Sequence, residues 1–270
     1  MKSPPTAAPA PAQAKRPQQL IGSFDKGLQI LDLVVTAGQP LRLQDIANSI
    51  RIDKSSASRF MATLQKHGLV DRDPRDKTFS VGTRLLMWSS NFKAGNTIVA
   101  KARPHLLRLT QMTHQTSHLA MLRDGRVVLM DGVSSDSAIA VRQPPGDSVP
   151  LHASAVGKAI LAFLPLPEQQ LLLERIDARE VAHSSPGSGD RLRDELRQVM
   201  RARLAYDEAE TIPHVSGIAA PVLDRSGYPV ASIGIATIAA LYPRGIRHEK
   251  ALADAVRQIA DEVSQEIDPP

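Results

Sequence analysis

Apolar residues between positions 41 and 82 change their spacing twice, and this pattern predicts two short helices followed by a β-hairpin. The first stripe recurs at helical spacing and consists of Leu43, Ile46, Ala47 and Ile50. The second stripe follows a break at residues 51–53 and consists of Ala57, Phe60, Met61 and Leu64. Residues with this spacing lie on one face of a helix, so both stripes are expected to face a shared core.

The second helix has a polar outer face. Asp53 or Ser55 is expected to cap it by accepting a backbone N–H of the first turn. The side opposite the apolar stripe carries Ser55, Arg59, Ala62 and Lys66, flanked by Ser58 and Thr63. Such a face suits a recognition helix, because short polar groups and long cations reach base edges and phosphates in the major groove.

A charged hairpin is predicted directly after this helix. Gly68 is expected to end the helix, and strands at 69–71 and 78–81 flank a turn at 73–77. A basic stripe alone is more often a solvated face, but the order of helices and hairpin favours a winged helix-turn-helix that binds DNA. The predicted DNA contacts are Arg42, Lys54, Ser55, Ser56, Ser58, Arg59, Thr63, Lys66, Arg72, Arg75 and Lys77.

The length of 270 residues suggests two domains. Residues 1–19 are rich in Pro, Ala and Gln and are expected to form a disordered arm, either touching DNA or simply solvated. A winged helix-turn-helix domain is predicted at 20–83 and a linker helix at 84–97. The single tryptophan, Trp88, lies on that linker helix and is expected to anchor a dimer interface or to pack in a core.

Residues 98–270 alternate between helical and strand-like patterns. Helices are expected at 98–113, 153–163, 167–176, 190–204 and 244–267. Strands are expected at 117–122, 127–133, 138–142, 215–223 and 229–238. The predicted fold class is therefore α+β, with a mostly antiparallel sheet flanked by helices in the second domain.

Charge is distributed unevenly between the two parts. Residues 1–100 contain 14 Lys and Arg against 7 Asp and no Glu, a net charge of +7. The remaining residues contain 19 Lys and Arg against 21 Asp and Glu, a net charge of −2. The basic first part therefore favours a polyanionic partner, whose binding would weaken with salt.

Several function classes are disfavoured. The chain has no Cys, so thiolate metal sites, thiol nucleophiles and disulfides are excluded, which fits a reducing cytoplasm. No apolar run predicts a signal peptide or membrane span. His114 and His118 have a spacing that suits a metal on one helix, but the helix is expected to end between them, so no metal is predicted.

The whole chain from about residue 23 resembles the IclR family of bacterial transcriptional regulators. The resemblance rests on "LQDIANSIRIDKSSASRFMATLQKHGLVDRD", "LHASAVGKAILAFLP" and "IAAPVLDRSGYPVASIGIA". It implies a winged helix-turn-helix, a linker helix used in dimerisation and a GAF-like C-terminal domain that binds a small effector. A homodimer or tetramer on a palindromic double-stranded operator is expected, with no cofactor and no membrane.

The resemblance also implies an effector pocket at the start of the helix in "LHASAVGK", whose free N–H groups suit a carboxylate. The expected lining is Met130, Leu151, His152, Ser154, Ala155, Val156, Asp207, His214, Gly217, Gly234 and Ala236. Gly234 and Ala236 stand where family members that bind small acids have hydroxyl residues. We therefore expect a roomier pocket for a bulky, aromatic or similar carboxylate, with His214 either a polar contact or a surface loop residue.

Two alternatives remain. Ser154 beside His152 and Lys158 would suit a hydrolase, but a capping role for Ser154 and a surface position for Lys158 are favoured, so no catalytic residue is predicted. No GxSxG, P-loop or HExxH motif occurs. The second alternative is a DNA-binding protein whose C-terminal domain only oligomerises and binds no ligand.

Overall fold

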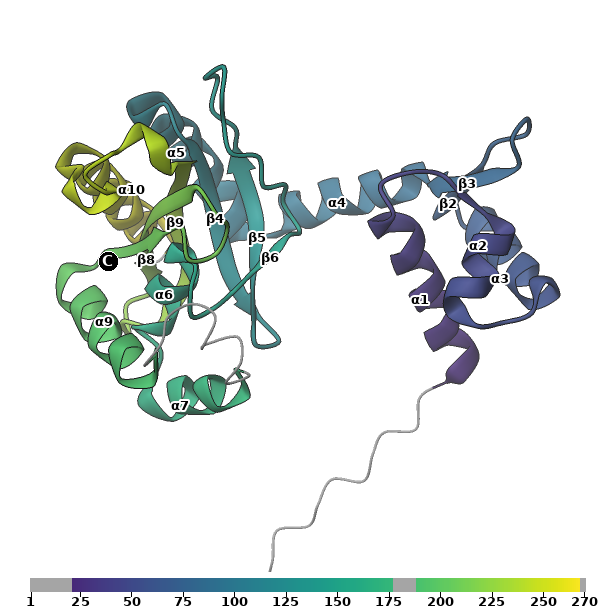
Figure 1. Ribbon diagram of the computed structural model, residues 1–270, viewed down its shortest axis with the longest axis horizontal. Helices are drawn as coiled ribbons and strands as arrows, with labels where there is room; N and C mark the ends of the chain where they lie inside the picture. Colours follow the sequence, from purple (N-terminus) through teal and green to yellow (C-terminus); the bar gives the residue numbers. More distant parts are fainter. Residues whose placement is uncertain (1–20, 177–187, 268–270) are drawn as a thin grey trace, which may run out of the picture. The chain divides into compact units, whose positions relative to one another are not determined.

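The computed structural model describes residues 21–176 and 188–267. Two compact units divide the chain, Met1–Asn91 and Phe92–Pro270, and each has its own hydrophobic core (Figure 1). The predicted arm at 1–19 lies outside the described residues. The chain folds as an α+β protein, as predicted from its sequence.

The N-terminal unit is a winged helix-turn-helix. Its three-stranded sheet has the order β1-β3-β2, with both neighbouring pairs antiparallel. Its elements are α1 (Gly22–Thr36), β1 (Leu41–Arg42), α2 (Leu43–Ile50), α3 (Lys54–Lys66), β2 (Val70–Arg72) and β3 (Thr78–Val81). The short strand β1 was not predicted, because a two-residue segment carries no alternation to detect.

Both predicted apolar stripes face the core of this unit. Ile46 of α2 and Met61 of α3 are buried in one cluster with Ile30 of α1. Gly68 has a φ of +67° and ends α3 in the left-handed conformation that favours glycine. The packing of the three helices and the sheet leaves the other side of α3 in solvent.

Helix α4 (Thr83–Gly95) follows the wing and covers most of the predicted linker helix at 84–97. The division between the two compact units falls within this helix, after Asn91. Its large apolar side chains are conspicuously exposed: Leu86 by 71%, Met87 by 65% and Trp88 by 49%. Trp88 is therefore not a core residue, and the exposed apolar surface favours the alternative in which it anchors an interface.

The C-terminal unit is built on an antiparallel six-stranded sheet with the order β6-β5-β4-β9-β8-β7. Its strands are β4 (Thr116–Arg123), β5 (Arg126–Val133), β6 (Ser148–Val149), β7 (Ala205–Glu208), β8 (Val215–Leu223) and β9 (Pro229–Ile238). Its helices are α5 (Thr97–Thr113), α6 (Ala155–Leu161), α7 (Leu166–Arg175), α9 (Ser188–Ala202) and α10 (Lys250–Ile267), with 3₁₀ turns η1 (Ala239–Leu241) and η2 (Ile246–His248).

Helices cover both faces of this sheet. Helices α5 and α10 pack on one face, and α6 lies on the other with α9 beside it (Figure 1). Successive residues of a strand point to opposite faces. In β4, for example, Leu119 belongs to the core under α5 and α10, while Ala120 belongs to the core under α6. The central strands are therefore buried on both sides.

Two sequence predictions in this unit are wrong. The segment 138–142 is a loop, in which the carbonyl of Val141 accepts from the side chain of Thr116. The final α-helix begins at Lys250 and not at 244, because Gly245 and a 3₁₀ turn precede it. The other predicted strands and helices of the unit are found, with ends that differ by a few residues at most.

No helix among residues 21–176 and 188–267 is long and apolar enough to cross a membrane.

Candidate DNA-binding surface and effector pocket

The outer face of α3 is exposed along its length. Its side chains in solvent include Lys54, Ser55, Ser58, Arg59, Thr63 and Lys66, all of which were predicted to contact DNA. Arg42, which precedes α2, is exposed as well. Ser56 is half-buried and faces the cap of the helix instead of the open surface. The geometry is that of a recognition helix whose N-terminal half is free to enter a groove.

Asp53 caps α3, which decides between the two capping residues considered from the sequence. Its carboxylate accepts from the amide of Ser56 at 2.9 Å and from the hydroxyls of Ser55 at 2.5 Å and Ser56 at 2.7 Å. These hydrogen bonds hold the pKa of Asp53 well below its ordinary value. In the free protein both serine hydroxyls therefore donate to the cap.

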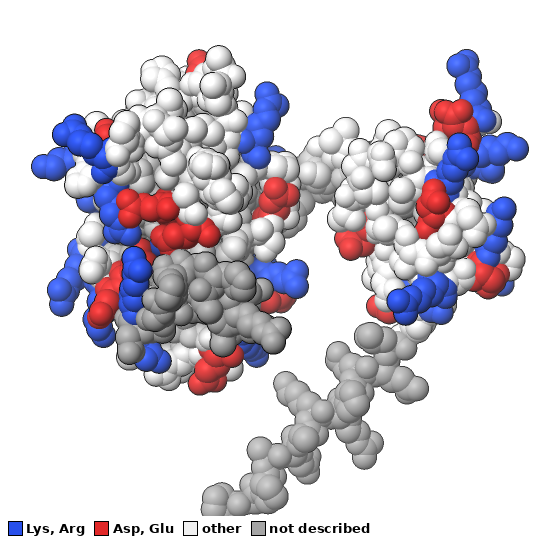
Figure 2. All heavy atoms as spheres, in the orientation of Figure 1, with Lys and Arg blue, Asp and Glu red and all other residues white. Residues whose placement is uncertain are grey.

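The wing projects charged side chains of both signs. Arg72, Arg75 and Lys77 are exposed, as expected for phosphate contacts, but so are the neighbouring aspartates (Figure 2). Asp73 accepts from the amides of Arg75 and Asp76 and so shapes the turn. Arg72 also lies over the ring of Phe79, 5.6 Å from its centre, which orients the root of the wing.

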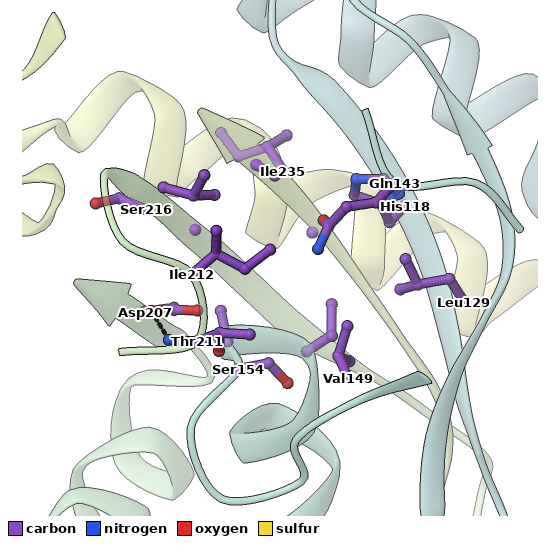
Figure 3. A pocket seen from close by; sticks show the side chains of 16 residues that line it. His118, Leu129, Gln143, Val149, Ser154, Asp207, Thr211, Ile212, Ser216 and Ile235 are labelled. Carbon is purple, nitrogen blue, oxygen red and sulfur yellow. Dashed lines mark hydrogen bonds between the residues drawn. The ribbon is translucent and has the colours of Figure 1, made fainter. Parts of the chain in front are cut away.

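A pocket opens in the C-terminal unit on the α6 face of the sheet (Figure 3). Its cavity volume is about 40 Å³, and the wider hollow, with the open solvent at its mouth included, measures about 440 Å³. Strands β4, β8 and β9 form one wall, and the start of α6 and the loop after β7 form others. Its lining is His118, Leu129, Gln143, Val149, Ser154, Ala155, Val156, Asp207, Thr211, Ile212, Val215, Ser216, Gly217, Gly234, Ile235 and Ala236.

Most of the predicted effector contacts line this pocket. They are Ser154, Ala155, Val156, Asp207, Gly217, Gly234 and Ala236. The apolar wall was not predicted from the sequence; it includes Leu129, Val149, Ile212 and Ile235. Two polar residues of the lining, His118 and Gln143, were not predicted either. Strand alternation would have found Leu129, whereas Gln143 and Ile212 lie on loops whose path no periodicity reveals.

Four predicted contacts lie elsewhere. Met130 sits at a bulge of β5 and packs in the core under α5 and α10, on the opposite face of the sheet. Leu151 and His152 precede α6 and line a separate depression with Arg126 and Arg175. His214 is exposed on the loop before β8, with a φ of +66°, so the alternative of a surface loop histidine is the correct one.

Gly234 does not indicate a larger ligand. A Cβ at this position would lie 2.5 Å from the carbonyl oxygen of Ile218 and 2.8 Å from the Cβ of Ala219, both on β8. The close approach of β8 therefore requires glycine here. The expectation that lost hydroxyl groups widen the pocket is wrong at Gly234, because neighbouring protein atoms occupy the space.

Ser154 caps α6, as predicted. Its hydroxyl donates to the carbonyl of Pro150 at 2.6 Å and accepts from the amide of Gly157 at 3.1 Å. The amides of Ala155 and Val156 head the helix and have no acceptor within it. A hydroxyl that donates to a carbonyl is not activated by a base, so the arrangement disfavours the hydrolase alternative.

Asp207 lies at the same end of the pocket. Its carboxylate accepts from the amides of Glu210 at 2.8 Å and Thr211 at 3.4 Å, which ties the loop after β7 to the sheet. Burial raises the pKa of Asp207, against the lowering effect of hydrogen bonds and of the charge of Lys158. The residues that line the pocket include no Lys or Arg.

Lys158 is fully buried, so its predicted surface position is wrong. Its ammonium lies 2.9 Å from a carboxylate oxygen of Glu195 on α9 and 2.8 Å from one of Glu210. Glu195 also pairs with Arg247 of η2 at 3.1 Å, and Arg247 pairs with Glu208 at 2.7 Å. This network joins α6, α9 and the loop after β7 beside the pocket.

The histidine pair considered for a metal is separated. His114 is exposed and ends α5 in the left-handed conformation, while His118 is buried on β4. Within 21–176 and 188–267, no group of three or more His, Asp or Glu side chains is arranged to hold a metal ion.

Comparison with known proteins decides the family. Residues 23–74 match the family described as IclR helix-turn-helix domain, and residues 94–265 match the family described as bacterial transcriptional regulator IclR C-terminal. The chain belongs to the IclR family. It is a DNA-binding transcriptional regulator, and its fold matches the architecture that its sequence predicted.

Relatives that match along most of their length are also named as transcriptional regulators. The HTH-type transcriptional regulator BhcR of Paracoccus denitrificans is 30% identical over 247 residues, which cover 90% of this chain and 86% of that protein. The transcriptional repressor IclR of Escherichia coli K12 is 26% identical over 233 residues, covering 86% of this chain and 83% of that one. Both of these relatives are named as transcriptional regulators.

Solved structures of the IclR family superimpose on most of the chain. The IclR of Thermotoga maritima has a TM-score of 0.76 at 26% identity and covers 92% of this chain and 99% of its own. An IclR homolog from Microbacterium hydrocarbonoxydans, complexed with 4-hydroxybenzoate, has a TM-score of 0.75 at 18% identity and covers 91% and 98%. The second likeness concerns the fold alone.

Proposed function

We propose that this IclR-family regulator binds a small organic acid, aromatic or similarly bulky, in the pocket on the α6 face, and that the acid alters its binding to operator DNA. The observation that carries the proposal is the pocket itself. The free amides at the start of α6 suit a carboxylate, and the apolar wall of Leu129, Val149 and Ile212 suits a hydrocarbon body. The homolog bound to 4-hydroxybenzoate gives a precedent within the fold.

The DNA-binding part of the proposal rests on the exposed face of α3 and the wing. Two copies of α3 on a palindromic operator require a two-fold symmetric dimer. The exposed apolar side chains Leu86, Met87 and Trp88 on α4 suit such a dimer interface, with pairing into a tetramer as a further step. The proposed DNA contacts are those named from the sequence, with Ser56 in a capping role.

Calorimetric titration of the full chain with a panel of acids tests the ligand. The panel contains glyoxylate, pyruvate, benzoate, the hydroxybenzoates and phenylacetate. We expect at least one aromatic acid to bind more tightly than either keto acid, because the apolar wall contacts the larger body. Binding of the keto acids alone would contradict the proposed ligand class, and binding of none would favour a C-terminal domain that only oligomerises.

The affinity for the acid is expected to rise as the pH falls through the raised pKa of Asp207, by at most about tenfold for each pH unit. A bound carboxylate and an ionised Asp207 repel each other, and Asp207 protonates more readily than an ordinary Asp because burial raises its pKa. Titration in buffers of different ionisation enthalpy should therefore show proton uptake on binding.

Asp207→Asn is the matched control for this pH dependence. The amide oxygen of Asn can still accept from the amides of Glu210 and Thr211, so the loop should keep its conformation. The variant is expected to bind the acid at pH 8 at least as tightly as the wild type and to lose the proton uptake. An unchanged pH dependence in this variant would show that Asp207 does not face the bound carboxylate.

A further inference from the structure

His118 is a buried polar side chain with no hydrogen-bond partner in the part of the chain that the structure describes. It lies on β4 with its side chain 4% exposed, and it lines the effector pocket (Figure 3). Both of its ring nitrogens are buried, and neither has a hydrogen-bond partner among residues 21–176 and 188–267. Burying a polar group without a hydrogen bond is costly, so most such groups in native proteins are satisfied or have a functional role.

The strands on either side of His118 offer it no polar side chain. Its cross-strand partners are Gly132 on β5 and Gly234 on β9, so neither neighbouring strand offers a side chain in that row. A Cβ at Gly132 would lie 3.0 Å from Nδ1 of His118, which shows how closely the ring passes over that strand. The imidazole therefore lies between two glycines, and its cross-strand neighbours supply no hydrogen-bonding side chain.

The imidazole is neutral at physiological pH. Burial lowers the pKa of His118 to about 4, so at pH 7 one ring nitrogen donates and the other accepts a hydrogen bond. A neutral ring suits an uncharged partner such as a hydroxyl or an oxo group. It offers little attraction to a carboxylate.

The polar groups of the pocket stand apart. In Figure 3, His118 and Gln143 lie together at one side, while Ser154, Asp207 and Thr211 lie at another. Leu129, Val149 and Ile212 contribute apolar surface to the space. A ligand that reaches both sides needs an apolar body with a polar group at each end, namely the carboxylate of the proposed function and a second, uncharged group.

We infer that His118 is a specificity-determining ligand contact, which hydrogen-bonds a hydroxyl or oxo group on the body of the acid. The effector class is then a hydroxy- or oxo-substituted carboxylic acid and not the plain hydrocarbon acid. This inference rests on the proposed function, because it assigns a second contact in the same pocket. A hydroxyl or oxo group of the ligand would pair with one of the two buried nitrogens.

The test compares matched acids on the full-length protein by calorimetry. Benzoate is paired with 2-, 3- and 4-hydroxybenzoate, and phenylacetate with 4-hydroxyphenylacetate. The wild type is expected to bind one hydroxylated acid about ten- to a hundredfold more tightly than its parent, because a site built to hydrogen-bond a hydroxyl rejects the analogue that lacks it. His118→Phe should abolish this preference, and His118→Gln should keep part of it.

His248→Phe is the matched control, because His248 is an exposed histidine of the same unit and lies outside the pocket. It should leave the preference unchanged. Equal binding of hydroxylated and parent acids by the wild type would overturn the role of His118 while the proposed function stands. A preference that survives in His118→Phe would do the same and would point to Gln143. Failure of every acid to bind would contradict the proposed function itself.

A spectroscopic measurement on the wild type tests the same contact even if a His118 variant fails to fold. With ring-¹⁵N-labelled histidine, the His118 signals are expected to shift when the preferred hydroxylated acid is added and to shift less with its parent acid. His118→Gln identifies these signals by their absence. Ring signals that respond equally to both acids, or to neither, would contradict a direct hydrogen bond.

Discussion

Replacing Glu195 and Glu210 together by glutamine is expected to destabilise the C-terminal domain by about 3 kcal/mol. The two substitutions remove both carboxylates that lie within 3 Å of the fully buried ammonium of Lys158. A buried ion pair contributes little net stability, but a buried charge without its partner is strongly unfavourable. The loop that begins after β7 is held by the same contacts, so effector binding should weaken as well.

Adding Lys158→Met to this double variant should recover most of the lost stability, because an apolar side chain of similar length then occupies the buried site. Urea unfolding followed by circular dichroism measures the effect. The fluorescence of Trp88, the only tryptophan, separates the transition of the N-terminal unit. Asp254→Asn, which breaks an exposed pair with Arg257, is the control and should cost less than about 1 kcal/mol. Equal losses in the control and the double variant would contradict the account of a costly buried charge.

Arg59→Ala is expected to weaken binding to the operator by about 1–3 kcal/mol, if Arg59 contacts a base edge in the major groove. Arg59 is exposed on the outer face of α3, and alanine favours helix, so the fold should be unaffected. Fluorescence anisotropy with operator and with random DNA, at the same salt concentration, measures the loss on each.

The comparison between operator and random DNA shows whether Arg59 contacts a base or a phosphate. A larger loss on the operator identifies a base contact, while equal losses on both identify a phosphate contact. Arg201→Ala removes an exposed arginine from the end of α9 in the other unit and should leave both affinities unchanged. No loss on either DNA would contradict the assignment of α3 as the recognition helix.

The N-terminal, DNA-binding unit was more predictable from sequence than the C-terminal unit, for a physical reason. Its core is made by helices whose apolar residues recur locally, so Ile46 and Met61 reveal their faces without knowledge of the rest of the chain. Even there, the choice of Asp53 over Ser55 as the cap depended on geometry. The two-residue strand β1 arises only because β3 pairs with it.

The pocket was less predictable, because it is made by distant segments. The resemblance to the IclR family located Ser154, Asp207 and Gly217, but it misplaced Met130, which lies on the opposite face of the sheet from Leu129. The burial of Lys158 depends on α9 and on the loop after β7, neither of which is adjacent in sequence. Charged residues are seldom fully buried, so the general expectation favoured the surface.

The position of His118 in the pocket could not be predicted from local sequence either. In the sequence it stood out only by its spacing from His114, which suggested a metal. Its position between two glycines follows from the pairing of β4 with β5 and β9. Strand register across the sheet, and not local spacing, therefore places the side chain that we assign to ligand recognition.

The most direct test of the central claim is whether the acid and the operator affect each other's binding. Full-length protein is titrated onto labelled DNA from beside its gene, with and without the acid that binds best in the panel. The account predicts a change of at least about fivefold in the operator affinity, and the same factor in the affinity for the acid when operator is present. An acid that binds the C-terminal pocket and leaves the operator affinity unchanged would contradict it.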